Sequence, residues 1–157
     1  MALLEVEDLK VHYPVRGGLF RPKRFVRAVD GVSFRMEPGE TVGLVGESGC
    51  GKSTLGKALV RLEKPAAGRV LLNGLDMSTL RGRELRRARK NFQMIFQDPY
   101  GSLNPRLTVF SALDEVLALH FPLTKAERRE RAAKLLDRVG LSAGALDRYP
   151  HEFSGGQ

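Results

Sequence analysis

The feature that most constrains the fold is a segment that runs from an apolar stretch through a glycine-rich loop into an amphipathic helix. Residues 41–45 form a short apolar run after the Pro38-Gly39 turn signal, as in strands buried on both faces of a parallel sheet. Apolar side chains then recur at helical spacing and predict one buried helix face: Leu55, Ala58, Leu59 and Leu62. The segment therefore predicts an α/β fold in which a strand, a loop and a helix follow one another.

The loop fits the pattern G-x-x-x-x-G-K-[ST] at every defined position. Glycines let the backbone wrap around phosphate oxygens, amide N–H groups point inward, and the dipole of the following helix favours an anion. Lys52 can reach the β- and γ-phosphates of a nucleotide, and the Ser53 hydroxyl can ligate Mg²⁺. The alternative is a glycine-rich strand-to-helix turn that holds no ligand. The candidate nucleotide-binding residues are Gly46, Glu47, Ser48, Gly49, Cys50, Gly51, Lys52, Ser53 and Thr54.

The composition of the 157 residues suits one soluble domain with an anionic partner. Lysine and arginine number 26 against 18 acidic residues, and the formal charge of +8 favours nucleotide, nucleic acid or a lipid surface. The single cysteine, Cys50, cannot form an internal disulfide, and the first residues are unlike a secretory signal. No window approaches the roughly 20 apolar residues of a membrane-spanning helix. We expect a reducing, cytosolic compartment, with any membrane contact made peripherally or through another subunit.

The rest of the chain divides into two parts with different patterns. Alternation and apolar runs predict four further strand segments at 9–13, 32–36, 70–72 and 92–96. Beyond residue 98 the spacing becomes helical, with Thr108 as a possible N-cap and a capping box formed by Thr124 and Glu127. We expect a β-rich part with the glycine-rich loop over residues 1–97 and a helical part over residues 98–157.

The two predicted helices of the second part have defined apolar faces. These are Val109, Ala112, Leu113, Val116 and Leu117 in the first helix, and Ala132, Leu135, Leu136 and Val139 in the second. Gly140 can close the second helix. Ion pairs from Glu127 to Arg131 and from Glu130 to Lys134 are expected on its solvent-facing side.

Residues 81–90 contain five arginines and one lysine against a single glutamate. Such a run could bind nucleic acid, because clustered cations release counterions from phosphate backbones. A solvated helix face is the favoured interpretation, since no aromatic residue is interleaved for base stacking, and no nucleic-acid partner is expected. The three histidines, His12, His120 and His151, have no metal-ligand spacing, so a structural zinc site is not supported.

Three motifs in a fixed order carry a resemblance to a known family. They are Gly-Glu-Ser-Gly-Cys-Gly-Lys-Ser-Thr at 46–54, Phe-Gln-Asp-Pro-Tyr-Gly-Ser-Leu-Asn-Pro at 96–105 and Tyr-Pro-His-Glu-Phe-Ser-Gly-Gly-Gln at 149–157. The chain resembles the ATPases of ABC transporters, most of all the ATP-binding subunits of dipeptide and oligopeptide importers. The resemblance implies an α/β P-loop NTPase fold with an N-terminal β-subdomain, an incomplete parallel core sheet and an α-helical subdomain. It also implies ATP and Mg²⁺ as cofactors.

The resemblance assigns roles to matching positions of this chain. It implies that Tyr13 stacks on adenine, with an aromatic that merely packs at a strand end as the alternative. It implies that Gln97 reaches both the Mg²⁺ and the water near the γ-phosphate, and that Ser53 ligates the same Mg²⁺. The alternative is that Gln97 only ends a strand. Lys52 and Gln97 would then contribute to catalysis. The signature motif, which closes over ATP held by an opposite subunit, is Ser154, Gly155, Gly156 and Gln157, preceded by Phe153 in place of the commoner leucine.

The resemblance further implies a function and its partners. An intact family member of this type couples ATP binding and hydrolysis to import of peptides through an integral-membrane permease. It pairs with a second ABC ATPase subunit, identical or different, and acts indirectly with a periplasmic or extracellular peptide-binding protein. The implied location is cytoplasmic and peripheral, on the inner face of the cell membrane.

One part of the family's pattern, the Walker B motif of four apolar residues followed by Asp-Glu, does not occur in the 157 residues. Without that aspartate the Mg²⁺ loses a partner, and without the glutamate nothing activates the attacking water. We therefore expect the chain as given to bind nucleotide without hydrolysing it. A truncated, non-catalytic nucleotide-binding or competitor module is the alternative. A small P-loop kinase or nucleic-acid-dependent NTPase is a weaker one, because the signature motif argues against it.

Overall fold

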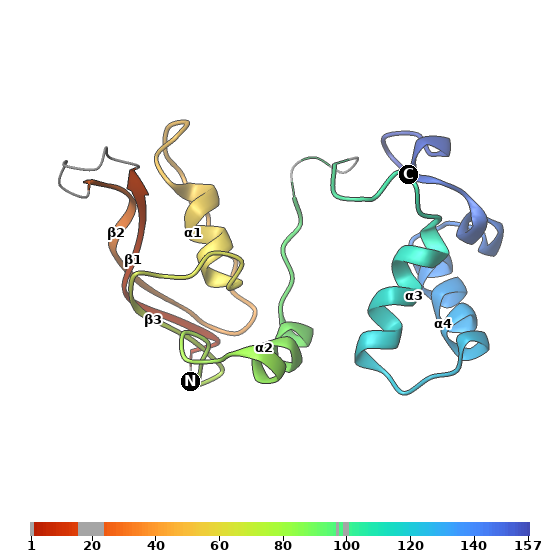
Figure 1. Ribbon diagram of the computed structural model, residues 1–157, viewed down its shortest axis with the longest axis horizontal. Helices are drawn as coiled ribbons and strands as arrows, with labels where there is room; N and C mark the ends of the chain where they lie inside the picture. The colour runs from red at the N-terminus through yellow and green to blue at the C-terminus, as the bar shows by residue number, and fades with distance from the viewer. Residues whose placement is uncertain (1, 16–23, 97, 99–100) are drawn as a thin grey trace. The chain divides into compact units, whose positions relative to one another are not determined.

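The computed structural model describes residues 2–15, 24–96, 98 and 101–157 of the chain (Figure 1). The chain forms two compact units, Met1–Met94 and Ile95–Gln157. Each unit has its own cluster of buried apolar side chains.

The first unit is built on a four-stranded antiparallel sheet with the order β2-β1-β3-β4. The strands are β1 (Leu4–Val15), β2 (Arg24–Met36), β3 (Ala67–Leu72) and β4 (Leu75–Asp76). In β1, Val6, Leu9 and Val11 are buried, with a register shift between Val6 and Leu9 that places both in the core. The predicted strand segments 9–13, 32–36 and 70–72 are confirmed.

Helix α1 (Lys52–Leu59) supplies Leu55 and Ala58 to the core of the first unit. The helix ends before Leu62, whose side chain is 52% exposed, so the prediction that Leu62 extends the buried face is wrong. A second short helix, α2 (Gly82–Ala88), buries Ala88 in the same core and is followed by a 3₁₀ turn, η1 (Arg89–Asn91).

Two segments predicted as strands are not assigned as strands: residues 41–45, expected in a parallel sheet, and residues 92–96. Val45 is 93% exposed and Ile95 is 95% exposed. A strand needs the backbone of a neighbour to satisfy its N–H and C=O groups, and no strand among the described residues pairs with either segment. The apolar composition of these two segments therefore predicts neither burial nor strand formation correctly within the described residues.

The second unit is a helical hairpin of α3 (Val109–His120) and α4 (Lys125–Arg138), followed by the 3₁₀ turns η2 (Ala143–Asp147) and η3 (Pro150–Glu152). Both predicted caps are confirmed. The Thr108 hydroxyl accepts from Ser111 N at 3.2 Å, and Thr124 and Glu127 form the complete capping box. The core of the second unit consists of Phe110, Leu117, Ala132, Leu136, Ala145 and Leu146.

Parts of the predicted helix faces differ in the structure. Val116, Leu135 and Val139 were predicted on the buried faces of the helices but are exposed. The packing of the two helices and the two 3₁₀ turns buries fewer apolar positions than the sequence pattern predicts. The Glu130–Lys134 ion pair forms at 2.6 Å. The predicted Glu127–Arg131 pair is replaced by other contacts: Glu127 completes the capping box, and Arg131 lies over the Phe121 ring at 4.1 Å.

None of the helices in the part of the chain described here is long and apolar enough to cross a bilayer.

Candidate functional site

The glycine-rich loop wraps around the ammonium group of Lys52, the first residue of α1. Lys52 Nζ donates to Gly46 O at 2.7 Å and to Glu47 O at 2.6 Å, and it lies 3.5 Å from Cys50 Sγ. The loop is tightened by a turn in which Cys50 N donates to Glu47 O at 3.3 Å. The loop therefore holds one cation at its centre, in contact with backbone carbonyls that an incoming phosphate can replace.

Gly51 is required where the loop meets the sheet. Its φ is +99°, and a Cβ on this residue would lie 2.1 Å from the carbonyl oxygen of Ala28 in β2. A Cβ on Gly46 would likewise lie 2.7 Å from Cys50 Sγ. Only glycine permits this close approach of the loop to itself and to β2. The glycines thus shape the narrow cradle that the sequence pattern predicts.

The N-terminus of α1 points its amide groups toward this loop. Leu55 N donates to Gly51 O at 2.8 Å, so the amides of Lys52, Ser53 and Thr54 have no carbonyl partner one turn earlier within the helix. The Ser53 side chain is exposed at the first turn. Amide donors, a helix N-terminus and a lysine ammonium in one place make a site for a polyanion such as a nucleotide phosphate chain.

A pocket of about 240 Å³ adjoins the loop, with Lys52, Cys50 and Asp30 among its lining residues. His12 Nε2 lies 3.3 Å from Asp30 Oδ1, and Arg27 Nη1 donates to Asp30 Oδ2 at 3.2 Å. The hydrogen bond with His12, followed by the hydrogen bond with Arg27 and the charge of Arg27, holds the pKa of Asp30 below its ordinary value of 3.8. Among the described lining residues Asp30 is the one carboxylate, and it is ionised and paired.

Sequence reasoning did not identify Asp30 or Ala28 as part of the site. Their place depends on the pairing of β1 with β2, in which His12 lies opposite Arg27 and the register shifts between Val11 and His12. A hairpin with irregular register gives no signal of this kind in the sequence. The alternation of both strands predicted the hairpin but not which polar side chains meet across it.

Tyr13, the predicted adenine-stacking residue, lies near the end of β1 opposite Val26 of β2 and is 36% exposed. Gly51 touches the Ala28 carbonyl two residues along β2. Tyr13 and the point where the loop meets the sheet therefore belong to the same β1–β2 hairpin, two residues apart along β2.

The Mg²⁺ ligands predicted from the sequence were Ser53 and Gln97. Gln97 lies outside the described residues. In the part of the chain that the structure describes, no three histidine, cysteine or acidic side chains converge as a metal site. Of the two predicted ligands, Ser53 is among the described residues. It is exposed at the first turn of α1 and offers its hydroxyl oxygen.

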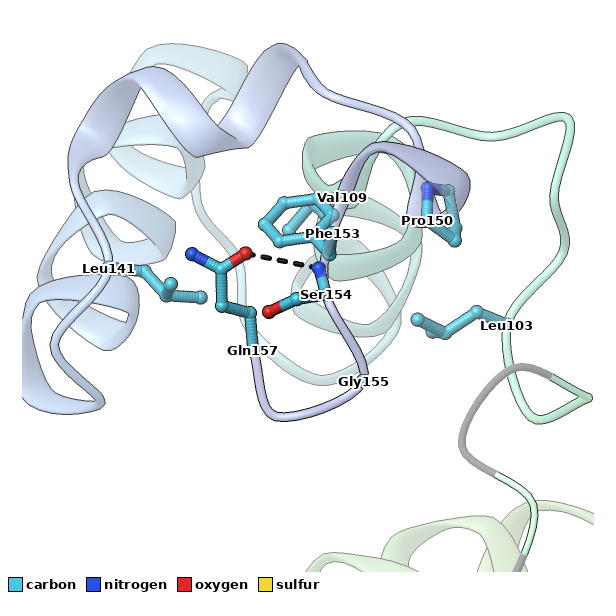
Figure 2. A pocket seen from close by; sticks show the side chains of 8 residues that line it. All are labelled: Leu103, Val109, Leu141, Pro150, Phe153, Ser154, Gly155 and Gln157. Atoms are coloured by element: carbon cyan, nitrogen blue, oxygen red, sulfur yellow. Dashed lines mark hydrogen bonds between the residues drawn. The ribbon is translucent and has the colours of Figure 1, made fainter.

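The signature residues form a closed turn in the second unit (Figure 2). Gln157 Oε1 accepts from Ser154 N at 3.1 Å, and Gln157 N donates to Ser154 O at 2.9 Å. Gly155 and Gly156, at the tip of this turn, are exposed. The turn borders an apolar pocket of about 230 Å³, also lined by Phe153. Arg148 covers the Phe153 ring at 4.3 Å, which fixes the segment that leads into the turn.

The loop site and the signature turn lie in different units. Within the first unit the loop approaches the β1–β2 hairpin through Gly51, at Ala28 of β2. Within the second unit the four signature residues lie in one turn.

A family model described as ABC transporter matches residues 29–157. The chain is 53% identical to the oligopeptide transport ATP-binding protein AppF of Bacillus subtilis, a match covering 99% of this chain and 48% of that protein. It is 49% identical to the dipeptide transport ATP-binding protein DppF of Escherichia coli, over 99% of this chain and 46% of that protein. The chain therefore spans about half the length of the curated relatives it matches.

Solved structures give the same assignment. The ATP-binding cassette MJ0796, in a dimeric post-hydrolysis state bound to ADP and Pi, aligns with a TM-score of 0.77 and 26% identity. That alignment covers 98% of this chain and 64% of the other. With the family model matching most of its length, the chain belongs to the ABC transporter family.

Proposed function

We propose that the chain is the nucleotide-binding part of an ABC ATPase that drives peptide import through a membrane permease. The observation that carries the proposal is the Lys52 ammonium held by two backbone carbonyls of the loop at the start of α1. The similarity to oligopeptide and dipeptide transport ATP-binding proteins supports the substrate class.

In this proposal the residues of the first unit bind the phosphate chain of ATP. Lys52 exchanges the carbonyls of Gly46 and Glu47 for the β- and γ-phosphate oxygens, which are stronger partners for an ammonium group. The amides of Ser53 and Thr54 donate to the same phosphates at the positive end of the helix dipole. The narrow glycine cradle fits this group, because side chains there would fill the space that phosphate oxygens need.

The other predicted site residues complete the proposal. Tyr13 stacks on the adenine ring, and residues 1–97 form the nucleotide-binding part. Mg²⁺, when bound with ATP, neutralises phosphate charge, with Ser53 and Gln97 as its protein ligands. The signature turn at residues 154–157, in the helical part 98–157, closes over ATP of a second subunit, which agrees with the dimeric state of the MJ0796 cassette. The protein works in the cytoplasm, on the inner face of the cell membrane.

We further infer that these 157 residues alone bind ATP without hydrolysing it. Hydrolysis needs a group that positions and activates water. The carboxylate lining the loop pocket, Asp30, is paired with His12 and Arg27, and its lowered pKa makes it a poor base. Peptide transport then requires the second ATPase subunit and the permease, with a peptide-binding protein acting indirectly.

The test is to incubate the 157-residue chain with radiolabelled ATP and Mg²⁺ and to identify the nucleotide that stays bound. We expect bound ATP with no ADP above background. A parallel assay uses protein isolated from source cells, whose intact mass is measured, and should show turnover if residues beyond these 157 are present. Failure to retain any nucleotide would contradict the proposal, as would phosphoryl transfer to a small acceptor or stimulation by nucleic acid.

A further inference from the structure

The net positive charge of the chain lies in one unit. Residues 1–94 contain 18 lysines and arginines against 10 acidic residues, whereas residues 95–157 contain eight of each. The formal charge of +8 therefore belongs entirely to the first unit. The loop site uses one of these cations, Lys52, so most of the excess is unexplained by nucleotide binding.

Helix α2 fixes a group of these cations in place. Arg83, Arg86 and Arg87 are three and four residues apart and share one side of the helix, next to Arg81 at its N-cap. The opposite side is apolar: Leu85 packs against the core of the first unit and Ala88 is buried in it. We call Arg81, Arg83, Arg86 and Arg87 the α2 basic face; all four are exposed.

Contacts with the backbone hold α2 and its flanks on the unit. Arg89 Nη2 donates to Arg61 O at 3.1 Å, and Arg61 Nε donates to Met77 O at 2.9 Å. The α2 basic face is thus carried by an anchored helix, and its charges keep a fixed relative position.

The ion pairing of these four arginines differs from that of four cations on the sheet. Lys10, Arg27, Arg35 and Arg69 each pair with a carboxylate on the same sheet. Within the described residues, no ion pair or hydrogen bond involves the side chain of any of the four α2 arginines. Glu84 is the one carboxylate of α2, so four positive charges stand against a single negative charge, and this excess costs free energy in the isolated chain.

The helix dipole stabilises only two of the four arginines of the α2 basic face. Cations are favourable in the last turn, where Arg86 and Arg87 lie, and unfavourable at the N-terminal end, where Arg81 and Arg83 lie. An anionic partner across the whole face would offset both the repulsion and the unfavourable dipole term.

We propose that the α2 basic face binds the anionic phospholipid headgroups of a membrane surface. A protein partner would need an apolar anchor at the centre of its contact, and the apolar side chains of α2 face the core. A layer of anionic headgroups needs none, because clustered arginines bind it through charge alone. Single-stranded nucleic acid is disfavoured by the lack of aromatic residues in α2. This contact goes beyond the proposed function and does not depend on nucleotide.

The test measures cosedimentation of the chain with phosphatidylcholine vesicles, with and without phosphatidylglycerol. The combined variant Arg81→Gln, Arg83→Gln, Arg86→Gln and Arg87→Gln removes four charges. Glutamine preserves helix propensity at these exposed positions. The matched control is Arg24→Gln, Arg35→Gln, Lys64→Gln and Arg69→Gln, which has the same net charge but leaves α2 intact. Circular dichroism confirms that each variant is folded.

We expect binding only to vesicles that contain phosphatidylglycerol, weakened by added salt. The α2 variant should lose about a hundredfold or more in partition, since each basic residue near the surface contributes on the order of 1 kcal/mol. The control should lose much less, and Lys52→Ala should bind vesicles normally even where ATP binding is lost. Equal binding to neutral vesicles, an equal loss in the two quadruple variants, or tighter binding to duplex DNA at the same ionic strength would overturn the proposal.

Discussion

Lys52 is the residue that organises the glycine-rich loop. Its ammonium bonds to the Gly46 and Glu47 carbonyls, so the loop is already closed around a positive charge. Such preorganisation lowers the entropy cost of binding, because phosphate replaces existing partners instead of ordering a mobile side chain. The loop therefore behaves as a ready anion site.

Gly51→Ala should destabilise the first unit strongly. The added Cβ would meet Ala28 O at 2.1 Å at a φ of +99°, so the loop must move away from β2. We expect a loss of at least about 3 kcal/mol in the free energy of unfolding, measured by urea denaturation.

Gly49→Ala is the matched control for that change. Its φ is +83°, but a Cβ there meets nothing within 4 Å, so only the backbone strain of about 1–2 kcal/mol applies. Equal losses in the two variants would show that the approach of Gly51 to β2 has no energetic importance.

At the scale of the secondary-structure elements, the capping box of α4 ties stability to pH. The hydroxyl and the backbone amide of Thr124 both bond to Glu127 and lower its pKa below the ordinary value of 4.5. A lowered pKa in the folded state means that the ionised form is favoured by folding. This contribution is therefore present above about pH 4.5 and is lost as the pH falls through the lower, folded value.

Thr124→Ala should cost about 1 kcal/mol at neutral pH, because it removes the helix cap. The difference from the unmodified chain should shrink in acid, where protonated Glu127 already weakens the box. The measurement is thermal unfolding of the whole chain at several pH values in this range. It follows the helical circular dichroism signal, to which α3 and α4 contribute. A difference that stays constant down to acid pH would contradict the role of Glu127.

The ion pair between α3 and α4 should matter more than the exposed pair beside it. Arg128 Nε lies 2.6 Å from Asp114 Oδ1, with side chains 16% and 24% exposed, and Arg128 Nη1 also donates to Leu123 O. Arg128→Ala should lower the unfolding midpoint of the second unit at least twice as much as Arg129→Ala, whose partner Asp147 is well exposed. Calorimetric midpoints for the two variants decide this, and equal shifts would be the contrary result.

Local signals in the sequence predicted the elements well where the structure depends on neighbours in the chain. The caps at Thr108 and Thr124, and the turn of the glycine-rich loop, are set by contacts within a few residues. Residues 41–45 and 92–96 failed as strands because strand formation depends on a distant partner. The His12–Asp30 contact was missed for a related reason, since it depends on cross-strand register.

On the scale of the whole molecule, the two units have separate cores and should respond differently to nucleotide. A ligand stabilises the regions whose folded form it binds. We expect MgATP to slow amide hydrogen exchange in peptides covering residues 46–59 and the β1–β2 hairpin. Peptides from α3 and α4 should be unchanged under conditions where the chain is monomeric. Uniform protection across both units would contradict the assignment of the site to the first unit.

The central claim is that the loop around Lys52 holds the phosphates of ATP, and equilibrium titration with MgATP tests it most directly. Lys52→Ala removes charge-assisted hydrogen bonds and should weaken affinity about 10- to 100-fold. Lys57→Ala, later in the same helix, serves as the control and should bind as the unmodified chain does. Equal affinities for the unmodified chain and Lys52→Ala would contradict the account, and a tenfold or greater loss confined to Lys52→Ala would confirm it.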